Sequence, residues 1–138
     1  MENFGILAQA NGFRKVAIRC NEQRPHGDGT IEWLPIQGTV NAAFACELYL
    51  KALLKAEGFS DKNLKKVGHK LKDLFSEVPS EVKNKIVNDY SIGISKIDVI
   101  SDTFYNWRYL HEDIQARMHN DNAFVYEFME ALYKISNS

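Results

Sequence analysis

The sequence predicts an all-α fold, an antiparallel up-and-down bundle of four to five helices. Apolar residues recur at spacings of three and four over several long stretches, which is typical of helices with one buried face. Short connections between successive stretches favour antiparallel packing of neighbouring helices. The chain has 138 residues, of which 45% are hydrophobic, and can bury one substantial core. A single domain over residues 1–138 is therefore expected.

The N-terminal part of the chain predicts a helix followed by a long loop. Residues 3–19 are expected to be helical, with an interruption near Asn11 and Gly12. Residues 21–38 contain two prolines and three glycines and predict the longest loop. A short strand at residues 30–34 is an open alternative. The apolar residues expected to hold this loop against the bundle are Trp33, Leu34 and Ile36.

Residues 40–57 form the strongest predicted helix. This stretch is rich in Ala, Leu, Lys and Glu, contains no Gly or Pro, and stops at Gly58. Its polar positions Glu47, Lys51 and Lys55 recur every four residues and leave one narrow polar stripe. The helix is therefore expected to be buried on most sides, at the centre of the bundle.

Two longer helices and two shorter helical pieces are expected in the second half of the chain. Two short ones cover residues 68–77 and 81–90, the latter capped by Ser80. Two longer ones cover residues 94–112 and 122–135, each with apolar residues at helical spacing. The apolar faces of these two helices comprise Ile97, Ile100, Phe104, Trp107, Phe124, Val125, Phe128, Met129, Leu132 and Ile135.

Composition argues against several classes of protein. No apolar run approaches the roughly 18 residues of a membrane span, and the N-terminus lacks the layout of a signal peptide, so a cytoplasmic protein with no membrane partner is expected. Cys20 and Cys46 are typical of small apolar residues. The four histidines and two cysteines have no metal-ligand spacing, and no glycine-rich phosphate loop is present. No metal and no cofactor are expected.

One local stretch is strongly basic although the formal net charge of the whole chain is -1. Residues 62–72 hold one histidine and five lysines, namely Lys62, Lys65, Lys66, Lys70 and Lys72. Such a patch is what a nearly neutral protein needs to hold RNA or a nucleotide phosphate. The alternative is a solvated, lysine-rich helix face.

Three stretches together resemble a known family. AAFACELYLKALL, GHKLKDLF and FYNWRYLHE occur in this order within residues 39–133. They resemble the HEPN family of small prokaryotic helical bundles, often found beside nucleotidyltransferases or in defence and toxin–antitoxin systems. The resemblance implies a domain that commonly forms a homodimer. It also implies RNA, a nucleotide, or a nucleotidyltransferase-like or antitoxin protein as the partner.

The catalytic motif of that family is altered in this chain. Catalytic members are metal-independent ribonucleases or toxins with an R-x(4-6)-H motif, whose Arg and His would stabilise phosphorane charge and transfer protons. Arg108 corresponds to the family arginine, but Tyr109 follows it and His111 stands only three residues on. With this altered motif, the resemblance implies a dimeric binding module without strong catalysis. The alternative is a metal-independent endoribonuclease toxin that uses Arg108 and His111 across a dimer cleft.

Each candidate site residue also has a structural alternative. Arg108 would bind phosphate, or form an ion pair with Glu112 at the helix edge. His111 would transfer protons, or pack beside the apolar stripe. Glu47, at a family position in the central helix, would orient Arg108 or pair with Lys51. His69, at another family position, is expected to cap a helix. The full set of supporting residues is Glu47, His69, Asn106, Tyr109 and Glu112.

Overall fold

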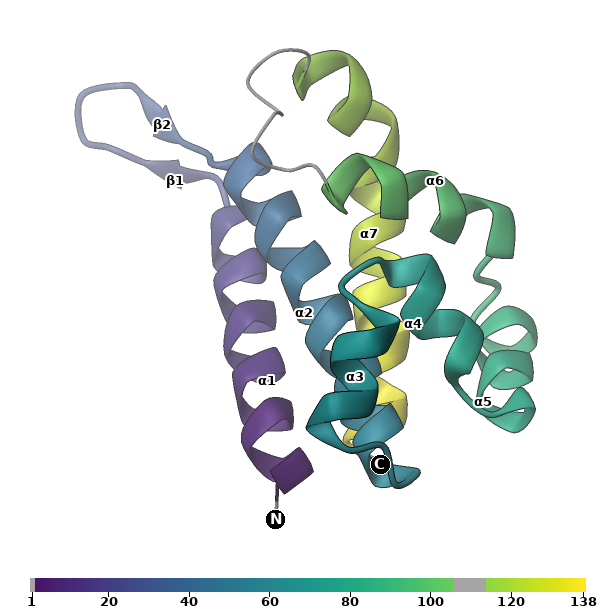
Figure 1. Cartoon of the computed structure of the whole chain (residues 1–138). Helices are drawn as coiled ribbons and strands as arrows, with labels where there is room; N and C mark the ends of the chain where they lie inside the picture. Colours follow the sequence, from purple (N-terminus) through teal and green to yellow (C-terminus); the bar gives the residue numbers. More distant parts are fainter. Residues whose placement is uncertain (1, 106–113) are drawn as a thin grey trace.

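The computed structural model describes the backbone of residues 2–105 and 114–138 and the side chains of residues 5–101 and 123–138. Within these residues the fold is all-α, as predicted, with one small hairpin added (Figure 1). No described helix combines the length and the apolar character needed to cross a bilayer. The elements are α1 (Glu2–Cys20), β1 (Arg24–Pro25), β2 (Ile31–Glu32), α2 (Pro35–Ala56), α3 (Asp61–Val67), α4 (Leu71–Glu77), α5 (Ser80–Asn84), the π-helical turn η1 (Lys85–Asp89), α6 (Ile94–Tyr105) and α7 (Ile114–Ser136).

The three long helices α1, α2 and α7 pack side by side (Figure 1). Helices α1 and α7 are antiparallel, because their contacts run in opposite order along the two helices. The Tyr126 hydroxyl donates to the Ala17 carbonyl, and Arg14 pairs with Glu130. The α1 and α2 helices are likewise antiparallel. By contrast, α2 and α7 run in the same direction, so the order of these three helices is not a simple alternation.

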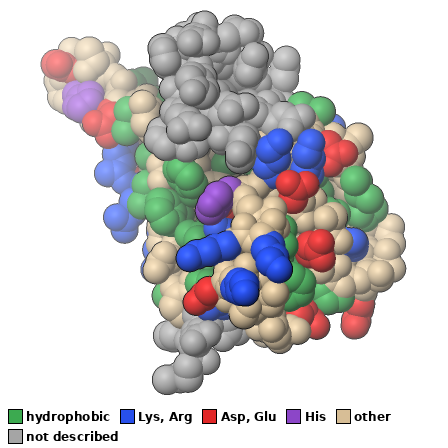
Figure 2. Space-filling model, viewed as in Figure 1, with side chains coloured by type: hydrophobic (Ala, Val, Ile, Leu, Met, Phe, Trp, Pro, Cys, Tyr) green, Lys and Arg blue, Asp and Glu red, His purple; other side chains and the backbone are tan. Residues whose placement is uncertain are grey.

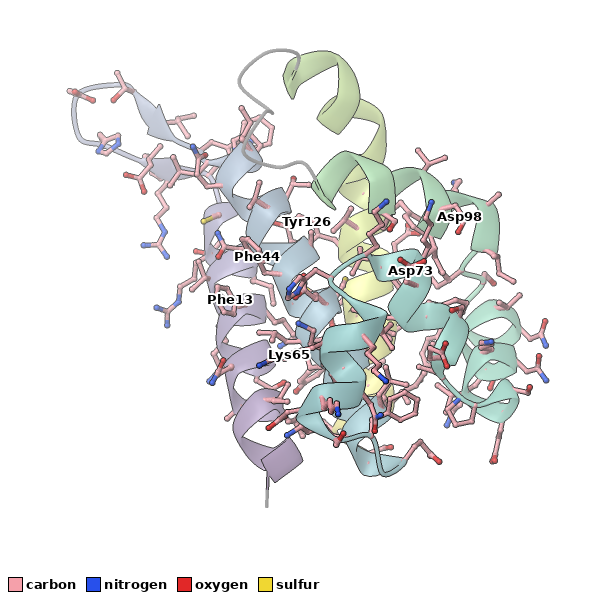
Figure 3. The ribbon with its side chains drawn as sticks, viewed as in Figure 1. Phe13, Phe44, Lys65, Asp73, Asp98 and Tyr126 are labelled. Atoms are coloured by element: carbon pink, nitrogen blue, oxygen red, sulfur yellow. The ribbon has the colours of Figure 1, made fainter. Side chains whose placement is uncertain are left out.

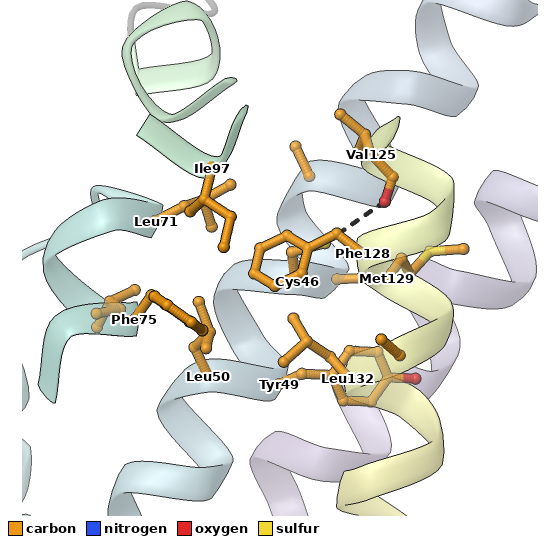
Figure 4. Close-up of a cluster of buried hydrophobic side chains, with 14 of the residues drawn as sticks. Cys46, Tyr49, Leu50, Leu71, Phe75, Ile97, Val125, Phe128, Met129 and Leu132 are labelled. Carbon is orange, nitrogen blue, oxygen red and sulfur yellow. Dashed lines mark hydrogen bonds between the residues drawn. The ribbon is translucent and has the colours of Figure 1, made fainter. Parts of the chain in front are cut away.

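The core lies between α2, α4, α6 and α7 (Figure 4). Leu50 of α2, Phe75 of α4, Ile97 of α6 and Phe128 of α7 are all buried there. The prediction that the central helix is buried on most sides is confirmed, because ten of the 22 residues of α2 are buried and only Gln37 and Ala56 are exposed. Its polar residues Glu47, Lys51 and Lys55 do not form a solvent-facing stripe, because their side chains are only 20%, 15% and 8% exposed and pair with one another or with Asp61 and His69. The helix begins five residues earlier than predicted, at Pro35, whose fixed backbone angle suits the first position of a helix.

The predicted interruption of the first helix is wrong. Asn11 accepts a hydrogen bond from the Tyr49 hydroxyl at 2.6 Å and donates one to Asn137 at 3.0 Å, so tertiary contacts hold this side chain in place. No atom outside the local backbone lies near the position of a Cβ at Gly12. Helix α1 therefore continues through both residues, because packing against α2 and α7 outweighs their low helix propensity.

The predicted long loop is a hairpin followed by the first turn of α2. Its short-strand alternative is confirmed by β2, which pairs with β1 in antiparallel register. The prediction that Trp33 and Leu34 anchor the loop is wrong, since they are 48% and 40% exposed. Ile36 does pack against the core. In Figure 1 the hairpin projects away from the bundle.

Several predicted boundaries in the second half also change. The predicted helix at residues 68–77 is preceded by a separate helix, α3, which ends at Gly68 with φ 94°. Ser80 is the first residue of α5 and makes no cap hydrogen bond, so its predicted role is wrong. Helix α7 begins at Ile114, before the predicted start. The buried positions expected in the last two helices are confirmed for Ile97, Ile100, Phe124, Val125, Phe128, Met129 and Leu132, and Ile135 packs against the core.

A capping box starts α3. The Ser60 hydroxyl accepts a hydrogen bond from the Asn63 backbone N–H at 3.1 Å, and the Asn63 side chain accepts one from the Ser60 N–H at 3.0 Å. We expect Ser60→Ala to lower the free energy of unfolding by about 0.5–2 kcal/mol, measured by urea denaturation. Ser80→Ala is the matched control, with an expected change within about 0.5 kcal/mol. Equal losses in the two variants would contradict this role of the box.

Candidate functional site

The predicted catalytic pair lies outside the described residues. This holds for Arg108 and His111. It also holds for three of the predicted supporting residues, Asn106, Tyr109 and Glu112. The geometry of the R-x2-H segment therefore stays a prediction. The two other supporting residues, Glu47 and His69, and all five lysines of the basic stretch are described.

Glu47 and His69 meet at a cluster that also contains Lys51. Lys51 Nζ donates to Glu47 Oε2 at 2.8 Å, which confirms the alternative of an ion pair along α2. The Nδ1 atom of His69 lies 3.1 Å from the same carboxylate oxygen and 3.1 Å from Lys51 Nζ. Two candidate site residues that lie far apart in the sequence are thus in direct contact. The expected contact of Glu47 with Arg108 stays untested.

The position of His69 follows from the turn between α3 and α4. Gly68 adopts a backbone angle that favours glycine, so the chain turns sharply after α3 and brings the imidazole against α2. The prediction that His69 caps a helix is wrong, because the residue before α4 is Lys70, and the Lys72 N–H in the first turn of α4 donates to the Ser101 hydroxyl at 3.0 Å. His69 contacts α2 instead.

The hydrogen bonds of this cluster depend on where the imidazole carries its proton. An Nδ1 atom that bears hydrogen donates to Glu47 Oε2, whereas an Nδ1 atom without hydrogen accepts from Lys51 Nζ. These two hydrogen bonds cannot form at the same time, because each needs a different protonation of the same Nδ1 atom. The side chains of Glu47 and Lys51 are 20% and 15% exposed, while that of His69 is 71% exposed. The imidazole is therefore held at one edge and open to solvent on the rest of the ring.

The five lysines of the basic stretch lie on α3, the following turn and α4. Lys62, Lys65 and Lys66 are exposed, and Lys70 and Lys72 are half-buried. Figure 2 shows Lys and Arg side chains gathered around a histidine on the face that carries these elements, and Lys65 is labelled on α3 in Figure 3. We call these five lysines together with His69 the basic face.

The single acidic residue of α3, Asp61, is already paired. Lys55 of α2 lies 2.6 Å from Asp61 Oδ1, and its hydrogen bond and charge lower the pKa of that carboxyl, with a smaller contribution from Lys65. In the part of the chain that is described, no ion pair joins a carboxylate to Lys62, Lys65 or Lys66. Lys62 and Lys65 therefore present positive charge to an anionic ligand, whereas Lys66 shares a hollow with Glu57 and Glu77.

The described residues give little support for metal binding, for a cysteine nucleophile or for an anion-binding pocket. No group of three His, Cys, Asp or Glu side chains within them could hold a metal ion. Burial raises the pKa of the Cys46 thiol, which therefore stays protonated and is a poor nucleophile. A shallow hollow beside Lys66 also has Glu57 and Glu77 in its lining, which oppose an anionic ligand there.

Sequence reasoning missed Lys51 as a site residue. Its spacing of four from Glu47 was a visible signal for an ion pair. Its contact with His69 had no local signal, because the two residues lie on different elements.

No family model, no curated protein and no solved structure matches this chain. The resemblance to HEPN domains therefore depends on the three sequence stretches.

Proposed function

We propose that this chain is a HEPN-like module that binds RNA through its basic face without strong cleavage of its own. In this proposal it acts in the cytoplasm as a homodimer, in a defence or toxin–antitoxin setting. The observation that carries the proposal is the concentration of exposed lysines on α3, which form no ion pair with any described carboxylate. Lys62, Lys65 and Lys66 are exposed there, and the acidic residue of that helix is neutralised by Lys55.

Local charge matters more here than the total charge. A net charge of -1 gives the whole protein no attraction to a polyanion. Lysines grouped on one face can still replace the counterions condensed on successive phosphates, which gives an affinity that falls steeply with salt. Tyr, Trp and Phe are absent from residues 61–72, so contacts there would be to the phosphate backbone and not to stacked bases.

Binding is favoured over cleavage by the altered motif. Two residues separate Arg108 from His111, where catalytic HEPN members have four to six. The histidine that the structure describes on the basic face, His69, has a largely exposed side chain. A catalytic base works best where water is excluded and the substrate is held in place.

The test is the salt dependence of RNA affinity, measured by fluorescence anisotropy with a labelled single-stranded RNA between about 50 and 200 mM salt. In Lys65→Gln/Lys66→Gln, the slope of log affinity against log salt should shrink by about 0.7 per lost phosphate contact, or about 1.4 in total. The matched control is Lys15→Gln/Lys85→Gln, which removes two exposed lysines outside the basic face. The control slope should equal that of the unchanged chain.

Two results would overturn the proposal. One is the absence of salt-dependent RNA binding, or an equal loss of slope in both double variants. The other is robust RNA cleavage in the presence of EDTA that is lost in Arg108→Ala and in His111→Ala. That second result would favour the metal-independent endoribonuclease.

A further inference from the structure

His69 differs from the lysines of the basic face because its charge depends on pH. Imidazole is the side chain that ordinarily gains or loses a proton near pH 6.5. In the cluster its Nδ1 atom is 3.1 Å from Glu47 Oε2, so an Nδ1 atom that carries a proton donates a hydrogen bond to this carboxylate. The remaining ring nitrogen, Nε2, makes no hydrogen bond with any described residue, and the side chain is 71% exposed.

The charges around His69 oppose one another. From α2, the Glu47 carboxylate and the Lys51 ammonium both lie 3.1 Å from Nδ1. Lys65 and Lys66 of α3 precede the turn, and Lys70 follows His69 directly. Lys72 of α4 adds a further positive charge nearby in the sequence. Asp73 of α4 and Asp61 of α3 add negative charges to these elements. An anion that binds beside Nε2 favours the charged imidazole, because an opposite charge stabilises the protonated form.

We propose that RNA binding to the basic face takes up one proton at His69. Glu47 then accepts the Nδ1–H of the imidazolium, and Nε2–H donates to a phosphate oxygen. The proton comes from solvent and no covalent bond is made or broken. This inference rests on the proposed function, and it makes the affinity for RNA increase as the pH falls through the imidazole range.

Proton uptake at His69 fixes the direction in which RNA affinity changes with pH. A group that binds a proton more tightly in the complex than in the free protein strengthens binding at low pH, by up to tenfold per pH unit for one proton. One added charge at contact distance from a phosphate, in a solvated site, corresponds to roughly fivefold. We therefore expect RNA to bind about fivefold more tightly at about pH 5.5 than at about pH 7.5. Carboxylates ordinarily titrate near pH 4 and stay charged over this range.

The experiment compares four variants by RNA anisotropy at the two pH values and constant salt. His69→Gln should abolish the pH dependence and leave the affinity close to its value at the higher pH. His26→Gln, which changes an exposed histidine in the turn of the hairpin, should keep the full effect. Glu47→Gln should weaken the pH dependence, and Lys51→Met should shift the onset of tight binding to higher pH.

A second measurement follows the imidazole directly and needs no change in affinity. In the ring-proton NMR spectrum, the titration of His69 should move to higher pH when RNA is added, and this movement should shrink in Glu47→Gln. Two results overturn this inference and leave the RNA-binding function standing. One is salt-dependent RNA binding with equal affinity at both pH values, and the other is a pH effect that persists in His69→Gln. Absence of RNA binding at both pH values overturns the proposed function and this inference together.

Discussion

Phe128→Ala is expected to lower the free energy of unfolding by about 3–5 kcal/mol. Phe128 is fully buried where α7 meets α4 (Figure 4). Its ring lies edge-on to Phe75, with centroids 6.2 Å apart, and is stacked with Phe124 at 6.1 Å. Alanine would leave a cavity bordered by both rings, because a close-packed core relaxes incompletely around lost atoms.

Urea denaturation monitored by circular dichroism measures this loss. Phe13→Ala is the control, because Phe13 is 36% exposed and, among the described residues, has a ring contact only with Phe44, with ring centroids 5.8 Å apart. Its loss should be about 1 kcal/mol. The loss of unfolding free energy in Phe128→Leu should lie between those of Phe128→Ala and Phe13→Ala. If Phe128→Ala cost no more than the control, the assignment of this residue to the core would be contradicted.

Gly38→Ala is expected to cost about 1–3 kcal/mol, although alanine is the better helix former. A Cβ at this position of α2 would lie 2.5 Å from Tyr126 Oη, 3.0 Å from Cys20 Cβ and 3.3 Å from the Ala17 carbonyl oxygen. Tyr126 cannot move freely, because its hydroxyl donates to that same carbonyl at 2.6 Å. The gain in helix propensity of about 0.5–1 kcal/mol is therefore outweighed by the clash.

Gly12→Ala is the matched control for this substitution. It lies in α1, and no atom outside the local backbone comes within 4 Å of a Cβ there. We expect it to raise the free energy of unfolding by about 0.5–1 kcal/mol in the same denaturation experiment. If Gly38→Ala lowers the free energy of unfolding and Gly12→Ala raises it, close helix packing decides whether alanine is tolerated at each position. A stabilised Gly38→Ala variant would contradict it.

The phenol of Tyr126 gives a second measure of the same contact. Burial raises its pKa to about 12, from an ordinary value of about 10. The neutral phenol therefore stabilises the folded state fully below pH 10, and this contribution is lost as the pH rises towards 12. In Gly38→Ala the displaced phenol should ionise at lower pH, detected by its ultraviolet absorbance. An unchanged titration would mean that Tyr126 keeps its place.

Much of the fold was predictable because its strongest signals are local. Apolar spacing along residues 40–57 identified the helix that forms the centre of the core, and the spacing after residue 122 identified the buried face of α7. Errors arose where a tertiary contact opposes local preference. Asn11 stays helical because Tyr49 and Asn137 bind it. Trp33 was expected to be an anchor because it is apolar, yet the hairpin carries it away from the bundle.

Glu47, His69 and the five lysines were named from the sequence, whereas the role of Lys51 in the site and the arrangement of these residues were not. The lysines and the pair Glu47 and Lys51 were visible because they follow one another along the chain at helical spacing. The contact of His69 with that pair required the turn at Gly68 to bring two helices together. No pattern within one segment encodes a distance between two segments.

By itself, the sequence determined the all-α class, the central buried helix and the local excess of positive charge in residues 62–72, because helical periodicity and composition depend on neighbours along the chain. The tertiary structure decided which way α2 and α7 run relative to each other, why Gly38 must be small, and that one imidazole nitrogen of His69 lies 3.1 Å from both a carboxylate and an ammonium. These properties arise from side chains that meet only after the helices have packed.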